Sequence, residues 1–412
     1  MSRLLAPKLS SASYGSLRLR DLHGAPHLHW RLRIIPQVAA RASFELGAGL
    51  PINTSAPEVK RPCYNPLQRR SAQRRWTHEG RRLRGRAARS PSIQRARGKN
   101  EVALIEGPLR LANVAEFSDA DVISTFVYSE LDRRVLAKLP RLKMVATRST
   151  GFDHIDLAYC AERNIIVRNV PTYGANTVAE HLFALLLTIS HRMREAVDRA
   201  RSGEFSPSGI QGFDLAGKTL GVVGAGSIGR HVIWIARGFE MIVVACDNNP
   251  DDALARELDF RYAPFEDVLG EADVLTLHVP GTSETANLLS EREFARMKNG
   301  VVVINIARGN LIDVRALIEA LRRGKVAAAG LDVLPDEPTI REEAELVCSI
   351  FCNRRDLRSV VADHVLLNMR NVVVTPHSAF NTREAVARIA ETTVGNIRAY
   401  VAGKARNVVA RP

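Results

Sequence analysis

The sequence has few cysteines: five are scattered through 412 residues, and no two of them form a Cys-x-x-Cys pair. This odd, dispersed set excludes a scaffold built on disulfides and gives no basis for a zinc knuckle or a thioredoxin-like site. We therefore expect reduced thiols, a cytoplasmic protein and no metal ion. Long apolar runs are also lacking. The stretch 182–189 is far shorter than the ~18–20 residues of a membrane-spanning helix, which excludes a transmembrane protein.

Negative charge is scarce at the N-terminal end. The chain carries a net charge of +14, but the excess lies in residues 1–99, where arginines crowd from Arg61 to Arg97 among proline, serine and glycine. The remainder of the chain is mildly acidic, so the charge describes a basic arm on a globular body. A composition of this kind favours disorder.

Three interpretations of residues 1–99 stay open. The one we favour is a disordered or spurious extension. An Arg-rich transit peptide and a nucleic-acid-binding arm are the others. Aromatic residues make up only 6% of the chain, which leaves few rings to stack on bases, so we do not expect the arm to bind nucleic acid.

The pattern of apolar and polar residues changes at about residue 101. Short apolar runs bounded by turn residues alternate with amphipathic stretches, which is typical of βαβ units and a parallel sheet. A long helix is predicted over 177–202, opened by a capping box of Thr177 and Glu180. The predicted strands are 102–105, 122–126, 144–147, 165–168, 219–223, 241–246, 274–278, 301–306, 327–333 and 372–375, and a last helix covers about 382–401.

These elements predict an α/β fold of two doubly wound parallel-sheet domains, of the Rossmann and flavodoxin-like type. We expect a substrate domain formed by residues 101–175 together with 378–412. The nucleotide-binding domain then covers 176–377.

A glycine motif, Gly224-Ala-Gly226-Ser-Ile-Gly229, gives the strongest local signal for a ligand. It lies between a predicted strand and an amphipathic helix, which is the arrangement that binds a dinucleotide pyrophosphate at a helix N-terminus. Asp247 ends the following strand, at the distance where an acidic residue accepts from the ribose hydroxyls. Since Asp247 would repel a 2′-phosphate, the motif predicts NAD rather than NADP.

Three charged side chains follow later strands of the same predicted sheet: Arg308, Glu337 and His377. Ligands of an open parallel sheet bind at the carboxyl ends of its strands, so we expect these groups in one cleft. An imidazole can take the proton of a hydroxyl, and a carboxylate can orient that imidazole. A guanidinium binds a carboxylate with two hydrogen bonds. The set suits the interconversion of a 2-oxo acid and a 2-hydroxy acid.

Seven stretches make the chain from about residue 101 onward resemble the D-isomer-specific 2-hydroxyacid dehydrogenases, and most of all their D-lactate dehydrogenase branch. They are 147–156 (TRSTGFDHID), 170–181 (VPTYGANTVAEH), the glycine motif, 278–280 (HVP), 305–309 (NIARG), 330–333 (GLDV) and 375–377 (TPH).

The resemblance implies roles for individual residues. Arg308 would bind substrate, Glu337 would support the histidine, and His377 would be the acid and base. The backbone at Thr150 and Gly151 would hold the substrate carboxylate. The expected contacts to NAD are Gly224, Gly226, Ser227, Ile228, Gly229, Asp247, Val279, Pro280, Thr285, Ile306, Ala307 and Asp332. The resemblance also implies a homodimer, with the long helix after Thr177 near the interface.

The preferred substrate follows from one loop. Tyr173 stands where lactate-type members have a tyrosine that contacts substrate, which favours pyruvate and D-lactate, although Gly174 replaces the serine that is common there. Phosphoglycerate or glyoxylate/hydroxypyruvate reduction is the alternative within the family. A corepressor that senses NADH is the alternative outside catalysis. The family's first strand and helix have no match in residues 1–99, so we expect the first βα unit to be missing.

Overall fold

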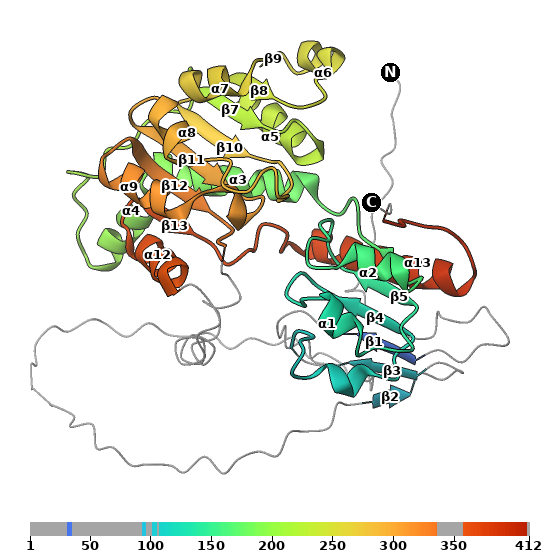
Figure 1. The fold of residues 1–412 in the computed structure, drawn as a ribbon. Coiled ribbons are helices and arrows are strands. Elements are labelled where there is room, and N and C mark those ends of the chain that lie inside the picture. The colour runs from blue at the N-terminus through green and yellow to red at the C-terminus, as the bar shows by residue number, and fades with distance from the viewer. Residues whose placement is uncertain (1–30, 35–92, 96–100, 105–106, 336–356, 410–412) are drawn as a thin grey trace, which may run out of the picture.

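The computed structural model describes residues 31–34, 93–95, 101–104, 107–335 and 357–409. Two sheets lie in separate lobes, with helices packed on both faces of each (Figure 1). The predicted α/β class with two parallel, Rossmann-like sheets is confirmed. No helix in these residues is long and apolar enough to cross a membrane.

The first sheet has the strand order β2-β3-β1-β4-β5-β6, and only β2 runs antiparallel. Its strands are β1 (Arg31–Ile34), β2 (Ile93–Arg95), β3 (Glu101–Leu104), β4 (Val122–Thr125), β5 (Met144–Thr147) and β6 (Ile166–Arg168). Alternate residues of β4 point to opposite faces: Ile123 packs with α1 (Arg133–Leu136) and α2 (Leu157–Glu162), together with η2 (Val114–Phe117). Val122 packs toward Ile397 of α13 (Arg383–Val401).

The presence of β1 and β2 differs from the sequence prediction, which found no strand in residues 1–99. Arg31–Ile34 pairs in parallel with both β3 and β4, in the middle of the sheet. In β1, two apolar residues alternate with two arginines, and a pattern of four residues is too short to predict a strand by itself. The backbone groups of β1 pair with those of the two neighbouring strands, and only these partners identify it. The rest of the predicted basic arm lies almost entirely outside the described residues.

The second sheet is wholly parallel, in the order β13-β12-β11-β10-β7-β8-β9. Its strands are β7 (Thr219–Val223), β8 (Ile242–Cys246), β9 (Arg261–Tyr262), β10 (Val274–Leu277), β11 (Val301–Asn305), β12 (Val326–Leu331) and β13 (Val372–Val374). The direction in which strands are added reverses between β7 and β10. In open α/β sheets, that reversal opens the crevice in which ligands bind.

Helices cover both faces of the second sheet, which explains why its strands are continuous apolar runs. One face packs against α3 (Ala175–Ser190) and α5 (Ser227–Gly238). The other packs against α7 (Phe265–Glu271), α8 (Glu291–Arg296), α9 (Val314–Arg322) and α12 (Leu357–Asn368), while α6 (Asp252–Glu257) lies beside β9.

The predicted single helix over 177–202 is wrong in its bounds. The chain forms α3 and then α4 (Met193–Arg201), and Arg192 between them adopts the left-handed conformation with φ of 48°. At the start, Gly174 is the N-cap and Thr177 is buried within the first turn, so Thr177 and Glu180 do not form the predicted capping box. The Glu180 carboxylate instead accepts a hydrogen bond from Asn176.

Candidate active site

The glycine motif forms a tight turn at the carboxyl end of β7. Gly224 has φ of +97°, in the region that favours glycine, and its amide donates to the Cys246 carbonyl of the neighbouring β8. A Cβ atom on Gly229 would lie 2.1 Å from the Gly224 carbonyl oxygen. Each of these two positions therefore requires glycine, as the motif predicts.

The N-terminus of α5 fits a dinucleotide phosphate. Gly226 is its N-cap and is exposed, with no atom within 4 Å of the place where a Cβ would lie. Ser227 is exposed and Ile228 half-buried in the first turn, where backbone amides have no partner inside the helix. The open space and the unpaired amides together provide an anion site on a helix of three turns.

Asp247 lies one residue beyond the end of β8 and braces this turn. Its Oδ2 accepts from the Ala225 amide at 2.7 Å, and its Oδ1 accepts from the Asn249 amide at 2.8 Å. The carboxylate is half-buried beside the glycine motif. The sequence analysis predicts that this carboxylate accepts hydrogen bonds from the ribose hydroxyls.

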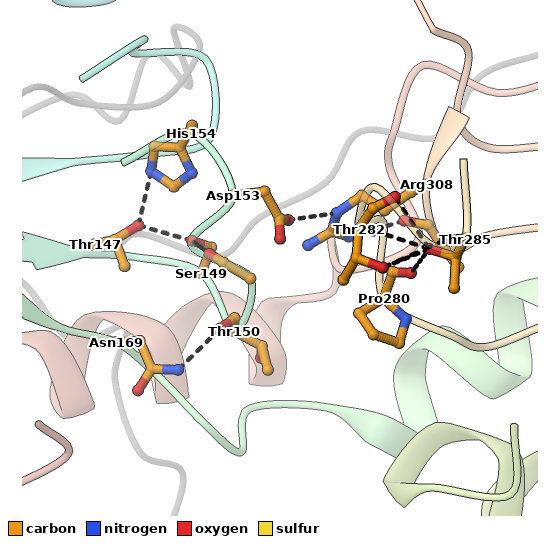
Figure 2. A network of polar contacts seen from close by, with 12 residues as sticks. Thr147, Ser149, Thr150, Asp153, His154, Asn169, Pro280, Thr282, Thr285 and Arg308 are labelled. Carbon is orange, nitrogen blue, oxygen red and sulfur yellow. Dashed lines mark hydrogen bonds and ion pairs between the residues drawn. The ribbon is translucent and has the colours of Figure 1, made fainter. Parts of the chain in front are cut away.

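The loop after β10 lies next to the glycine turn. A Cβ on Gly224 would lie 3.1 Å from both the His278 backbone and a Val279 methyl. Thr285 fastens the loop, since its hydroxyl donates to the Pro280 carbonyl at 2.6 Å and accepts from the Thr282 amide (Figure 2). Burial lowers the pKa of His278 to about 3, so this imidazole is neutral.

Arg308 lies three residues beyond β11, between two glycines. A Cβ on Gly281 would lie 2.9 Å from Arg308 Cγ, and a Cβ on Gly151 would lie 1.7 Å from Arg308 Nη2. The predicted contact residues Ile306 and Ala307 connect Arg308 to the strand. Ile306 is buried, and Ala307 accepts from Arg308 Nη1 at 2.8 Å.

The loop after β5 brings a carboxylate from the first lobe to this guanidinium. Asp153 Oδ2 accepts from Arg308 Nε at 2.8 Å, as Figure 2 shows between the two lobes. In the same loop, the Thr150 hydroxyl donates to the Val170 carbonyl, and the Thr150 carbonyl accepts from Asn169. Within the described part of the chain, the amides of Thr150 and Gly151 have no acceptor. They are available to an anionic ligand.

His377 lies three residues beyond β13, in strained backbone. Its φ is 50°, which is uncommon for a residue with a side chain and often marks a functional site. Its amide donates to the carbonyls of Asp332 and Thr375 at 2.9 and 3.0 Å. Because β11, β12 and β13 pair in register, Arg308, Asp332 and His377 emerge at one edge of the sheet.

Asp332 holds the turn that carries His377. Its buried carboxylate accepts from the hydroxyl of Thr375 at 2.5 Å and from the amides of Ser378 and Ala379 at 2.8 and 2.9 Å, and His181 Nε2 lies 3.3 Å away. Burial raises the pKa of Asp332, but these hydrogen bonds outweigh it and leave the pKa below its usual value. The aspartate is therefore charged and enclosed by protein groups.

The phenol of Tyr173 is close enough to Arg308 and Asp332 for both charges to affect its pKa. Burial raises the pKa of its phenol, Arg308 lowers it and Asp332 raises it again, so the phenol stays protonated as a hydrogen-bond donor. Its ring packs beside an apolar cluster that includes Phe126 and Phe380, whose ring centroids are 5.2 Å apart.

The structure thus brings most of the predicted residues to one edge of the second sheet, with Thr150, Gly151 and Tyr173 contributed from the chain before α3. Glu337 lies outside the described residues. Sequence reasoning missed Asp153 and His181, although both stand in the quoted stretches at 147–156 and 170–181. Only one indication in the sequence suggests that these two residues belong to the site: each is a polar residue inside a stretch that resembles the family.

Comparison with known proteins gives consistent matches. The profile of the "D-isomer specific 2-hydroxyacid dehydrogenase, NAD binding domain" family matches residues 183–379. A "2-hydroxyacid dehydrogenase homolog" of Haemophilus influenzae is 37% identical over 308 residues, covering 73% of this chain and 87% of that protein. A glyoxylate reductase of Pyrococcus furiosus is 35% identical over 293 residues, covering 69% and 81%.

A solved structure agrees with these sequence matches. The D-lactate dehydrogenase of Aquifex aeolicus, described in complex with NAD and lactic acid, is similar with a TM-score of 0.66 and 37% identity. The alignment covers 75% of this chain and 93% of that one.

Proposed function

The chain belongs to the D-isomer-specific 2-hydroxyacid dehydrogenases and is an NAD-dependent oxidoreductase, and from that premise we propose that it interconverts pyruvate and D-lactate. The observation that carries this proposal is the setting of Arg308. Its guanidinium is held between Gly151 and Gly281, facing two unpaired backbone amides and near the protonated Tyr173. That is a site for one carboxylate, and the apolar cluster around Phe126 suits a small methyl group beside it.

The chemistry of the step divides between cofactor and protein. When bound, the cofactor would provide the hydride chemistry at the C2 carbon of the substrate, as donor in its reduced form NADH and as acceptor in its oxidised form NAD+. Arg308 and the amides of Thr150 and Gly151 bind the substrate carboxylate and fix its orientation. His377 gives a proton to the carbonyl oxygen in reduction and takes it from the hydroxyl in oxidation. Glu337 is proposed to support that imidazole.

The cofactor site is proposed along the carboxyl edge of β7, β8, β10 and β11. The pyrophosphate would lie at Gly224, Gly226 and the N-terminus of α5, and Asp247 would accept from the ribose hydroxyls. The other proposed contacts are Ser227, Ile228, Gly229, Val279, Pro280, Thr285, Ile306, Ala307 and Asp332.

We propose the domain division of the sequence analysis, with β1 and β2 added to the first domain because they lie in its sheet: 101–175 with 378–412 for substrate, and 176–377 for NAD. The Asp153–Arg308 contact spans the two, so closure of the cleft would exclude water from the reacting atoms. We also propose a homodimer through α4 and the segment after it. Met193, Val197 and Phe205 support this interface because they are exposed, Phe205 by 84%.

A substrate panel tests the proposal. NADH oxidation is measured with pyruvate, glyoxylate, hydroxypyruvate and 3-phosphohydroxypyruvate, and the values of kcat/KM are compared. We expect pyruvate to give the highest value. A higher value with glyoxylate or with the phosphorylated acid assigns the chain to one of the alternative substrates, and no turnover with any of them refutes the proposed reaction.

A further inference from the structure

We propose that Asp153 is a positioning residue for Arg308, which holds the guanidinium in the direction needed to bind the substrate carboxylate. The inference rests on the proposed function, in which Arg308 binds that carboxylate. The two side chains come from different lobes and lie 155 positions apart in the sequence. The contact is therefore tertiary and joins the two lobes.

The hydrogen bonds of Arg308 divide its guanidinium into a held edge and an open edge. Nε donates to Asp153 Oδ2 at 2.8 Å, and one N–H of Nη1 donates to the Ala307 carbonyl at 2.8 Å. A guanidinium has five N–H groups, so three are left, and none of them has an acceptor within the described part of the chain. Two of the three belong to Nη2, which lies against Gly151. The open edge faces the loop whose amides are unpaired.

Asp153 is itself held in place by its neighbours. The Ser149 hydroxyl donates to the Gly151 carbonyl at 2.6 Å, which fixes the loop on one side. On the other side, the His154 carbonyl accepts from the Leu131 amide at 2.8 Å, and the buried Ile155 anchors the chain in the core. The backbone of Asp153 is thus a fixed support from which its carboxylate reaches across to the second lobe (Figure 2).

The need for such a support follows from the exposure of Arg308. Its side chain is 33% exposed and that of Asp153 is 44% exposed, so water competes for both groups. An arginine has several rotatable bonds, and without a partner at Nε only the hydrogen bond from Nη1 to the Ala307 carbonyl would hold the guanidinium, which could then sample more directions. Two glycines leave room for it but supply no direction. A displacement of about 1 Å at a reacting site can cost on the order of 100-fold in rate.

The test compares Asp153→Ala and Asp153→Asn with the wild-type enzyme, using steady-state kinetics with pyruvate and with glyoxylate. We expect Asp153→Ala to raise KM by about 10-fold or more, because the guanidinium loses its direction. Asp153→Asn keeps an oxygen that can accept from Nε, so it should recover a large part of the loss. The Kd of NADH should stay within about twofold, since Asp153 is not among the proposed contacts to the cofactor.

A matched control is available in the same lobe. Glu162 forms a similar arginine–carboxylate pair with Arg133 at 2.7 Å, at the end of α2 and away from the cleft. Glu162→Ala should leave KM and kcat unchanged. The melting temperature of every variant is measured, so that a loss of fold is distinguished from a loss of substrate binding.

Three results would overturn the inference: a wild-type KM in Asp153→Ala, a lowered KM in that variant, or a raised KM that Asp153→Asn does not rescue in any part. The Arg308→Ala variant separates this failure from that of the proposed function. If Arg308→Ala also leaves KM unchanged, Arg308 does not bind the substrate and the proposed function fails. If only Arg308→Ala raises KM, the substrate role stands and Asp153 does not position it.

Discussion

The amide of His377 donates a 2.9 Å hydrogen bond to the carbonyl oxygen of Asp332, while the carboxylate of the same aspartate accepts from the next two amides after His377. One residue therefore holds a strained turn from both sides. The φ of 50° at His377 is costly for a side-chain-bearing residue, and these bonds maintain it. The backbone that carries the imidazole we propose as acid and base is thus held by a buried charge one residue beyond the end of β12.

Substitution of Asp332 should disturb both stability and turnover. Asp332→Asn removes the charge and places a donor NH2 group among donors, so we expect the free energy of unfolding to fall by about 2 kcal/mol or more and kcat to fall at least about 10-fold. Denaturant unfolding and steady-state kinetics measure the two effects.

Asp273→Asn is the matched control for that substitution. Asp273 accepts from the Thr219 amide and from Lys298 at the opposite edge of the same sheet, so the variant should lose stability but keep its kcat. An Asp332→Asn enzyme with wild-type stability and kcat would contradict the role of Asp332 in holding the turn.

Space for Arg308 depends on Gly151. A Cβ on Gly151 would meet the guanidinium at 1.7 Å, so Gly151→Ala must move Arg308 from its place. We expect KM for pyruvate to rise by about 10-fold or more, with little change in NADH affinity. Gly270→Ala, in α7 where no atom lies within 4 Å of the new methyl group, serves as the control. Equal kinetic constants for the two variants would refute this prediction.

Cofactor affinity should depend on Asp247. Asp247→Ala removes the acceptor at the end of β8 and the bond that braces the Ala225 amide. We expect the Kd of NADH to rise by about 10-fold, corresponding to about 1.4 kcal/mol, and the preference for NADH over NADPH to decrease. Fluorescence titration with both nucleotides measures this. If both affinities stay at wild-type values, Asp247 does not bind the ribose.

Stability should fall in mild acid because of His154. Burial lowers the pKa of His154 from 6.5 to about 4, so between these values the unfolded chain binds a proton that the folded chain does not. By linkage, this proton uptake by the unfolded chain lowers the free energy of unfolding as pH falls from ~6.5 toward ~4. Above pH ~6.5 both states are neutral at His154, and the full free energy of unfolding is present. We expect the melting temperature of the wild type to drop across this window, and His154→Asn to drop less. Identical slopes for the two proteins would contradict the assignment.

Six of the seven strands of the second sheet could be predicted from the sequence within about two residues, because strands buried on both faces are continuous apolar runs between turn residues. The short β9, whose residues are Arg261 and Tyr262, has no such run and was not predicted. The glycine turn could also be predicted, since Gly224 and Gly229 each meet a backbone constraint that only glycine satisfies. Both signals are local in the sequence.

Features that depend on tertiary contacts could not be predicted. The break between α3 and α4 lies at Arg192, whose left-handed backbone has no sequence signature of the kind glycine gives. The strand Arg31–Ile34 is recognisable only between its two partners. The Asp153–Arg308 pair joins residues from two lobes, and no periodicity relates them.

Transfer of deuterium tests the central claim most directly. NADH carrying deuterium at the transferred position of C4 is incubated with pyruvate and the wild-type enzyme, and the product is analysed for label and configuration. The account predicts D-lactate with deuterium at C2, and a loss of about 100-fold or more in its rate of formation with His377→Ala. Unlabelled product, L-lactate, or an undiminished rate in the His377 variant would contradict it.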